Sequence, residues 1–128
     1  LQELCDAENM GLILITHDLA VVSQVTEKIA VMYAGRIIEM GPTEEIVHRP
    51  RHPYTKGLIN SLPWGRRAAK RLTQIPGMMP TLTDIPPGCA FHPRCTVSVP
   101  LCLEKRPELA PDEVRDHAVA CHNLGMLK

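Results

Sequence analysis

The chain has 128 residues, enough for one domain of ordinary size or for a small domain with an appendage. Hydrophobic residues make up 45% and charged residues 22%, a composition typical of globular chains rather than disordered ones. No apolar run approaches the roughly 20 residues of a membrane-spanning helix, so we expect no transmembrane subunit. Lys plus Arg and Asp plus Glu both number 14, and this zero net charge argues against a basic nucleic-acid binder.

The two halves of the chain differ in charge and in proline content. Residues 1–64 carry five Lys or Arg against eight Asp or Glu, whereas residues 65–128 carry nine against six. Three prolines precede residue 60, and the other nine follow from Pro63 onward. We therefore expect two segments of different kind, joined near Pro63. The chain opens on Leu1 rather than on Met, and we expect this start to be a cut inside a longer protein.

The first half predicts alternating helices and strands. Residues 1–9 have the spacing of a helix end, and residues 12–16 form a continuous apolar run, typical of a parallel strand buried on both faces. Asp18 is suited to cap a short helix over residues 19–25. Residues 28–33 and 36–40 are β-rich, and the two residues between them, Ala34 and Gly35, have the spacing of a hairpin turn.

Short helices and then loops are expected after the hairpin. Pro42 ends the second strand, and Thr43 with the two glutamates that follow begins a short helix. An amphipathic helix that includes Tyr54 ends at Pro63. From Trp64 onward, prolines and turn residues allow little regular structure. We expect this loop-rich segment to need a metal, disulfides or docking onto a neighbour for its stability.

His17 is the first candidate functional residue. It follows the expected parallel strand, and ligands bind at the carboxyl ends of strands in open α/β sheets, so its side chain would point into a site. The alternative is an ordinary hydrogen-bonded histidine of the core or surface. The motif in which His17 stands favours the functional interpretation.

Residues 14–19, with residues 29–39 and Gly41, resemble the end of the nucleotide-binding domain of ATP-binding cassette (ABC) transporters. The resemblance implies that His17 is the catalytic switch-loop residue beside the γ-phosphate of ATP. Residues 51–58 and 88–95 look like the carboxyl-terminal extension of oligopeptide and dipeptide importer ATPases. The resemblance covers nearly the whole chain. It implies that residues 1–48 end the nucleotide-binding domain and that residues 49–128 form the extension.

The expected fold class is therefore α/β. It is the C-terminal piece of an ABC-type nucleotide-binding domain, with a parallel strand, a helix, a β-hairpin and short helices, followed by a loop-rich, cysteine-containing extension. The sequence holds no G-x-x-x-x-G-K-[ST] phosphate loop, no family signature and no apolar run ending in Asp-Glu. The resemblance implies ATP and Mg as cofactors of the parent protein. Because phosphate-loop amides supply most phosphate affinity, we expect this chain alone to be inactive as an ATPase.

Four cysteines form the second candidate site, for a cofactor or a metal: Cys89, Cys95, Cys102 and Cys121, separated by 5, 6 and 18 residues. Four thiolates suit a [4Fe-4S] cluster or a structural zinc, and the spacing matches the common motif of neither. The resemblance extends to an iron-sulfur cluster that some family members carry in this extension. Free buried thiols and disulfides remain open, although disulfides rarely persist in a reducing compartment. Cys5 is expected to be a small buried residue outside this site.

Several charged residues near these sites have both a functional and a surface interpretation. Three basic residues close to the cysteines in sequence either offset the charge of a cluster or are solvated: Arg94, Lys105 and Arg106. Four more beside Trp64 form either a phosphate or lipid-headgroup patch or a solvated helix face or linker: Arg66, Arg67, Lys70 and Arg71. We favour the solvated interpretation, because a single aromatic residue offers no stacking platform.

The histidines other than His17 predict no metal site, because their spacing is scattered: His48, His52, His117 and His122 among them. We expect His52 to cap or pack at the start of the helix that follows it.

The leading functional hypothesis is the carboxyl-terminal part of the ATP-hydrolysing subunit of a peptide-type ABC importer, with a docking or regulatory extension. The resemblance implies a second ATPase subunit and membrane permease subunits as partners, and no nucleic acid. It also implies a peripheral position on the cytoplasmic face of the cell membrane. The alternative is a free-standing metal-binding or iron-sulfur-binding interaction module, in which the strand and the hairpin are only scaffold.

Overall fold

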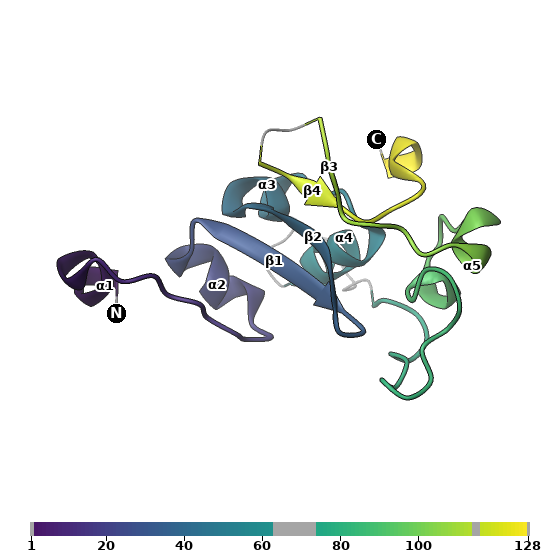
Figure 1. Cartoon of the computed structure of the whole chain (residues 1–128), viewed down its shortest axis with the longest axis horizontal. Helices are drawn as coiled ribbons and strands as arrows, with labels where there is room; N and C mark the ends of the chain where they lie inside the picture. The colour runs from purple at the N-terminus through teal and green to yellow at the C-terminus, as the bar shows by residue number, and fades with distance from the viewer. Residues whose placement is uncertain (1, 63–73, 114–115, 128) are drawn as a thin grey trace.

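The computed structural model describes residues 2–62, 74–113 and 116–127, which form short helices around a small antiparallel sheet (Figure 1). The helices are α1 (Gln2–Glu8), α2 (Leu19–Val25), α3 (Thr43–His48), α4 (Pro53–Asn60) and α5 (Leu101–Glu104). Two 3₁₀ turns are η1 (His92–Arg94) and η2 (Leu124–Leu127). The strands are β1 (Lys28–Tyr33), β2 (Arg36–Pro42), β3 (Ala110–Pro111) and β4 (Ala118–Val119). Within these ranges, no helix is long and apolar enough to cross a membrane.

The hairpin of β1 and β2 confirms the sequence prediction. Ala34 and Gly35 form its turn with φ angles of 47° and 77°, and positive φ at both central residues is what a tight type I′ turn requires. Side chains of β1 alternate between the two faces, and Ile29, Val31 and Tyr33 are the buried ones. The alternation gives the sheet one apolar face on which helices pack.

Two very short strands from the part of the chain predicted to be the extension join the same sheet. The strand order is β1-β2-β4-β3, with every neighbouring pair antiparallel. β2 carries a bulge, because the register shifts between Val31 paired with Glu39 and Met32 paired with Ile37. The carbonyl oxygen of the bulged residue, Ile38, accepts a hydrogen bond of 2.8 Å from the amide of Ala120, just beyond β4. The hairpin and the extension thus share one hydrogen-bonded sheet.

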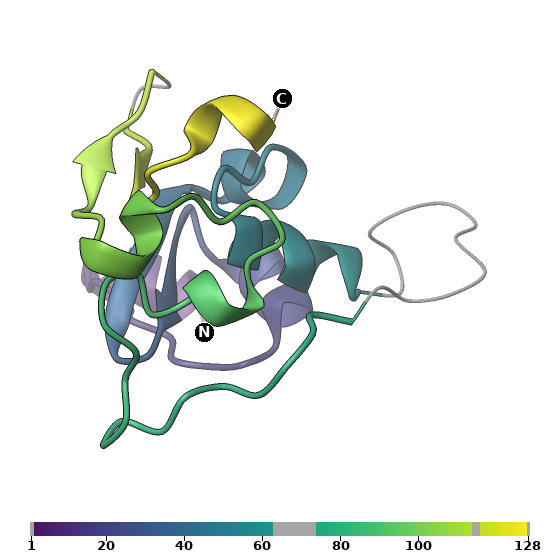
Figure 2. The same cartoon turned by 90° about the vertical axis from the view of Figure 1, so that its right-hand side faces the viewer.

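The apolar core lies between the hairpin and the first helices. Ile29, Val31 and Ile46 form its buried centre, and residues of α2, β2, α3 and α4 pack around them. Figure 2 shows α3 and α4, in blue and teal, on one side of the hairpin. The later part of the chain, in green and yellow, passes over the rest of the sheet. The predicted helices are present, and α4 ends at Asn60, three residues before the predicted end.

Residues 12–16 do not form the parallel strand that the sequence predicts, and this part of the expected fold was wrong for the described chain. The segment has no strand, and the side chains of Ile13 and Ile15 are 89% and 93% exposed. A parallel strand depends on hydrogen bonds and burial from neighbouring strands, and no described strand pairs with this segment. Figure 1 shows α1 standing apart from the sheet, at the far end of this segment.

Candidate functional site

His17 lies in the exposed segment that leads into α2. The residues on either side of it are fixed by local hydrogen bonds, because Thr16 Oγ1 accepts from the Asp18 amide at 3.0 Å. Asp18 Oδ1 in turn accepts from the amides of Ala20 at 2.9 Å and Val21 at 3.3 Å, and this confirms the predicted N-cap. The imidazole itself is exposed. The role of His17 beside a γ-phosphate remains a prediction.

Glu39 of β2 is a fully buried acid that the sequence analysis did not single out. Its Oε1 accepts from the Arg51 amide at 2.6 Å, and its Oε2 accepts from the His52 amide at 3.0 Å. The Nε2 of His117 lies 2.9 Å from Oε1 and donates to it, because a carboxylate only accepts. The sequence gives one sign of this buried hydrogen-bond network: an acidic residue, Glu39, within a largely apolar strand, where it needs buried hydrogen-bond partners.

Two further residues extend this network to the surface. Arg51 Nε lies 3.1 Å from Asp112 Oδ2, and the same oxygen lies 3.9 Å from His117 Nδ1. We call Glu39, Arg51, Asp112 and His117 the buried polar cluster. His117 fits only because Gly41 has no side chain, since a Cβ there would lie 2.9 Å from its ring. The cluster therefore ties Asp112 and His117, near the end of the chain, to β2 and to the loop before α4.

His52 caps α4, as the sequence predicts. Its Nδ1 accepts from the Tyr54 amide at 3.1 Å, so the ring hydrogen of the neutral imidazole is on Nε2. The side chain is 2% exposed, and burial lowers the pKa of His52 from 6.5 to about 4. His52 is therefore uncharged at neutral pH.

Three aromatic rings and one arginine connect the hairpin, α4 and the extension. The ring centroids of Tyr33, Tyr54 and Phe91 lie 4.7 to 5.5 Å apart with edge-to-face geometry. Arg94 donates to the Tyr33 hydroxyl at 3.3 Å and to the carbonyl of Pro76 at 2.8 Å. Its guanidinium is thus engaged in packing the extension onto the hairpin, which favours a structural role over an offset of cluster charge.

All five cysteines of the chain are free thiols, and the four of the second candidate site lie between residues 89 and 121. Burial raises the pKa of Cys89, Cys95 and Cys121, and charge on the neighbouring thiols raises it further. Cys102 acts on all three of them, and its carbonyl accepts from the Cys89 amide at 2.8 Å. Cys5 lies on α1 and contributes to none of these shifts.

Backbone amides point at three of these sulfurs. In Cys89, Cys95 and Cys121 the amide two residues further along bonds to the sulfur and lowers the pKa of the thiol. The bond from Asn123 N to Cys121 Sγ is 3.4 Å long. Amide hydrogen bonds stabilise thiolates and are among the factors that tune sulfur-ligated metal centres. The local backbone is therefore suited to hold charged sulfur, although burial outweighs this effect in the free thiols.

The donor set fits a sulfur-ligated centre, but the side chains are not in ligating positions. Within residues 2–62, 74–113 and 116–127, no three His, Cys, Asp or Glu side chains are arranged to hold a metal ion. The second basic group of the sequence analysis, Arg66, Arg67, Lys70 and Arg71, lies outside the described residues. Of the three basic residues near the cysteines in sequence, Lys105 forms a hydrogen bond through its backbone: its carbonyl accepts from His122 Nε2 at 2.8 Å.

The sequence is similar to ATP-binding subunits of peptide transporters. It is 46% identical over 109 residues to the dipeptide transport ATP-binding protein of Escherichia coli (strain K12), covering 85% of this chain and 33% of that protein. It is 43% identical over 122 residues to the dipeptide transport ATP-binding protein of Haemophilus influenzae, covering 95% and 36%. A Brucella ovis protein named for peptide import and ATP binding is 43% identical over 123 residues, covering 91% and 36%.

A protein-family model narrows this class to one region of such transporters. The model described as "Oligopeptide/dipeptide transporter, C-terminal region" matches residues 38–102, which is half of the chain. The chain therefore belongs to the family of the oligopeptide/dipeptide transporter C-terminal region. It spans about a third of the length of the curated relatives that it matches.

Proposed function

We propose that this chain is the carboxyl-terminal part of the ATP-hydrolysing subunit of a peptide-type ABC importer. The observation that carries the proposal is the similarity to dipeptide transport ATP-binding proteins over 85% to 95% of the chain. This similarity includes residues on both sides of the proposed boundary, with residues 1–48 ending the nucleotide-binding domain and residues 49–128 forming the extension. A free-standing metal-binding module is not favoured, because it gives no reason for similarity in the first half.

In the proposed mechanism, two such subunits enclose ATP and Mg, and their closure drives two permease subunits to change access. The subunit then lies on the cytoplasmic face of the membrane. His17 contacts the γ-phosphate and assists its attack by water. The extension is a docking or regulatory module, held to the hairpin by the buried polar cluster. The sequence has no phosphate loop, so this chain by itself neither binds ATP tightly nor hydrolyses it.

Two observations test this assignment. The coding sequence upstream of Leu1 is expected to encode a phosphate loop and an apolar run ending in Asp-Glu. The purified 128-residue chain is expected to show no ATP turnover above buffer, measured by phosphate release. Turnover by the chain alone, or an upstream sequence without a phosphate loop, would contradict the proposal.

The role of His17 is tested in the complete subunit. His17→Ala is expected to lower ATP turnover at least about 100-fold while changing nucleotide affinity little, because a contact made as the phosphate is attacked acts mainly on the transition state. His48→Ala is the matched control, since His48 is another exposed histidine, on α3. Equal losses of turnover and affinity, or equal effects of the two variants, would rule out the proposed role.

We also infer that Cys89, Cys95, Cys102 and Cys121 hold a sulfur-ligated centre, a [4Fe-4S] cluster first and zinc second. Support comes from the mutual electrostatic effect of the thiols and from the amides directed at three sulfurs. When bound, such a centre supplies a cross-link between distant parts of the extension. The buried apolar residues of the extension are few for its length, so a cross-link would add stability to it: Ile59, Phe91, Cys102, Val119 and Ala120.

Metal analysis of anaerobically purified protein tests the cysteine site. We expect iron and sulfide, or zinc, bound at one centre per chain, and each of four Cys→Ser changes should lower both bound metal and protease resistance. Cys5→Ser is the control and should leave both unchanged, because Cys5 lies on α1. A metal-free parent protein with an equally resistant extension would count against the centre. Air must be excluded throughout, because oxidation destroys thiol ligation.

A further inference from the structure

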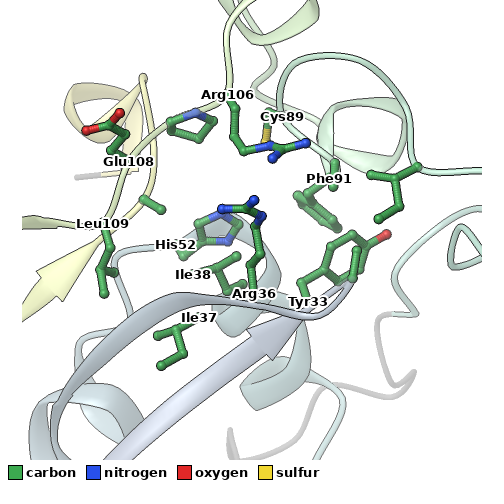
Figure 3. Close-up of a pocket in the computed structure, with 15 residues that line it drawn as sticks. Tyr33, Arg36, Ile37, Ile38, His52, Cys89, Phe91, Arg106, Glu108 and Leu109 are labelled. Atoms are coloured by element: carbon green, nitrogen blue, oxygen red, sulfur yellow. The ribbon is translucent and has the colours of Figure 1, made fainter. Parts of the chain in front are cut away.

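A cavity of about 550 Å³ opens between the hairpin and the extension (Figure 3). This volume falls within the range of about 300 to 1,000 Å³ that is common for small-molecule sites. Its walls come from the turn end of β1 and β2, from His52 before α4, and from residues 89–91 and 106–109 of the extension. Because these segments are far apart in sequence, the cavity exists only in the folded chain.

One side of the cavity is apolar. Phe91 is 4% exposed and forms part of the floor, and Ile38 is half-buried beside it. Ile37 and Leu109 also line the cavity, and each of them is still 39% exposed. Covering apolar surface that is in contact with water by an apolar group lowers the free energy, and so favours binding. The cavity therefore offers a place for an apolar or aromatic body.

The charged residues of the cavity are two arginines and one glutamate, which leaves a net charge of +1: Arg36, Arg106 and Glu108. In the part of the chain that the structure describes, neither guanidinium forms a hydrogen bond or an ion pair. Figure 3 shows both guanidinium groups over the same opening as the His52 ring. Two unpaired guanidinium groups, with planar forks of donors, are suited to a carboxylate.

His52 contributes a neutral donor to the same cavity. Its Nδ1 already accepts from the Tyr54 amide, so Nε2 carries the hydrogen. No acceptor for this hydrogen occurs among the described residues, and Nε2 is not one of their fully enclosed atoms without a partner, so it stays accessible from the cavity that His52 lines. The pKa of about 4 keeps the ring uncharged at neutral pH. A ligand oxygen would satisfy a donor that the protein leaves open.

We propose that this cavity binds a small organic carboxylate with an apolar body. Arg36 and Arg106 hold the carboxylate, His52 Nε2 donates to it, and Phe91 with its apolar neighbours covers the body. The proposal does not depend on the role of His17, which does not line the cavity; Cys89 lies in the cavity wall but takes no part in holding the carboxylate.

Isothermal titration of the 128-residue chain with 4-phenylbutyrate tests the proposal. This acid has about a dozen non-hydrogen atoms, and we expect a dissociation constant below about 1 mM. The alcohol 4-phenylbutan-1-ol lacks the charge and acetate lacks the apolar body, so each should bind at least about tenfold more weakly. These comparisons use the unaltered protein and do not depend on any variant folding.

Arginine variants locate the site. R36Q and R106Q should each weaken 4-phenylbutyrate binding at least about tenfold, because each removes one partner of the carboxylate. R49Q is the matched control, since Arg49 pairs with Glu45 on α3 and does not line the cavity. Circular dichroism checks that the fold is retained. Absence of binding, equal binding of the acid and the alcohol, or equal effects of the three variants would overturn the proposal.

Discussion

Replacing Glu39 by alanine should destabilise the whole fold, because the buried carboxylate accepts from three donors. The change would leave the amides of Arg51 and His52 and the Nε2 hydrogen of His117 without their acceptor. Each buried donor left unsatisfied costs about 1–3 kcal/mol, and water entering the space recovers part of this. The expected loss in the free energy of unfolding is about 3–5 kcal/mol, because three donors lose their acceptor and water recovers part of the cost.

Urea unfolding of the 128-residue chain, followed by far-ultraviolet circular dichroism, measures this loss. Glu45→Ala is the matched control, because Glu45 pairs with Arg49 at 3.5 Å and the arginine side chain is 76% exposed. Such surface pairs contribute about 1 kcal/mol or less. Glu39→Gln should fall between the two, since the amide keeps the shape but turns one acceptor into a donor.

A loss below about 1 kcal/mol for Glu39→Ala, equal to that of Glu45→Ala, would refute the reasoning. It would mean that the extension does not close over Glu39 in solution. Limited proteolysis supplies an independent measurement, because an extension released from β2 is cleaved faster. The expected order of cleavage rates is Glu39→Ala, then Glu39→Gln, then the parent chain.

Two further predictions concern single residues. Between pH 7 and pH 4 the unfolded chain protonates His52, whose folded pKa is about 4, so stability should fall by up to about 3 kcal/mol. His52→Asn keeps a capping side chain and should remove this part of the fall in urea titrations. Gly88→Ala should cost at least about 2 kcal/mol, because φ is +70° and a Cβ would lie 2.3 Å from the Cys102 carbonyl. Gly125→Ala meets no atom within 4 Å and is the control for thermal unfolding.

Elements that depend on neighbouring residues alone could be predicted from the sequence. The turn at Ala34 and Gly35, the cap at Asp18 and the cap at His52 each follow from residue types at adjacent positions. The strand predicted at residues 12–16 is absent from the structure. Apolar composition indicates that a segment can be a buried strand, but the strand also needs neighbouring strands to pair with, and none is described beside this segment. β3 and β4 could not be predicted, since two residues carry no periodicity and their pairing is decided by tertiary contacts.

The candidate sites also divide into features that local sequence predicts and features that depend on tertiary contacts. Cysteine content predicts a shared site, but no three ligating side chains among the described residues are arranged around a metal, so this site stays a prediction. Contact between Glu39 and His117 joins residues 78 positions apart, and no local pattern predicts such a partner. The cavity with Arg36 and Arg106 likewise combines a hairpin with a distant loop. Its arginines look like ordinary surface charges in the sequence, and only the fold places them around one opening.

Pairing of β4 with β2 has a consequence for any shortened form of the chain. β1 covers one edge of β2, and the other edge is covered at Glu39 and Met40 by β4 and at Ile38 by the amide of Ala120. Removing the last strands would expose unpaired amides and carbonyls along a strand that also bears apolar side chains, and open edges of this kind recruit other strands. A shortened chain that ends before β4 would therefore present a second open edge, on β2, to which the strand of another chain can pair.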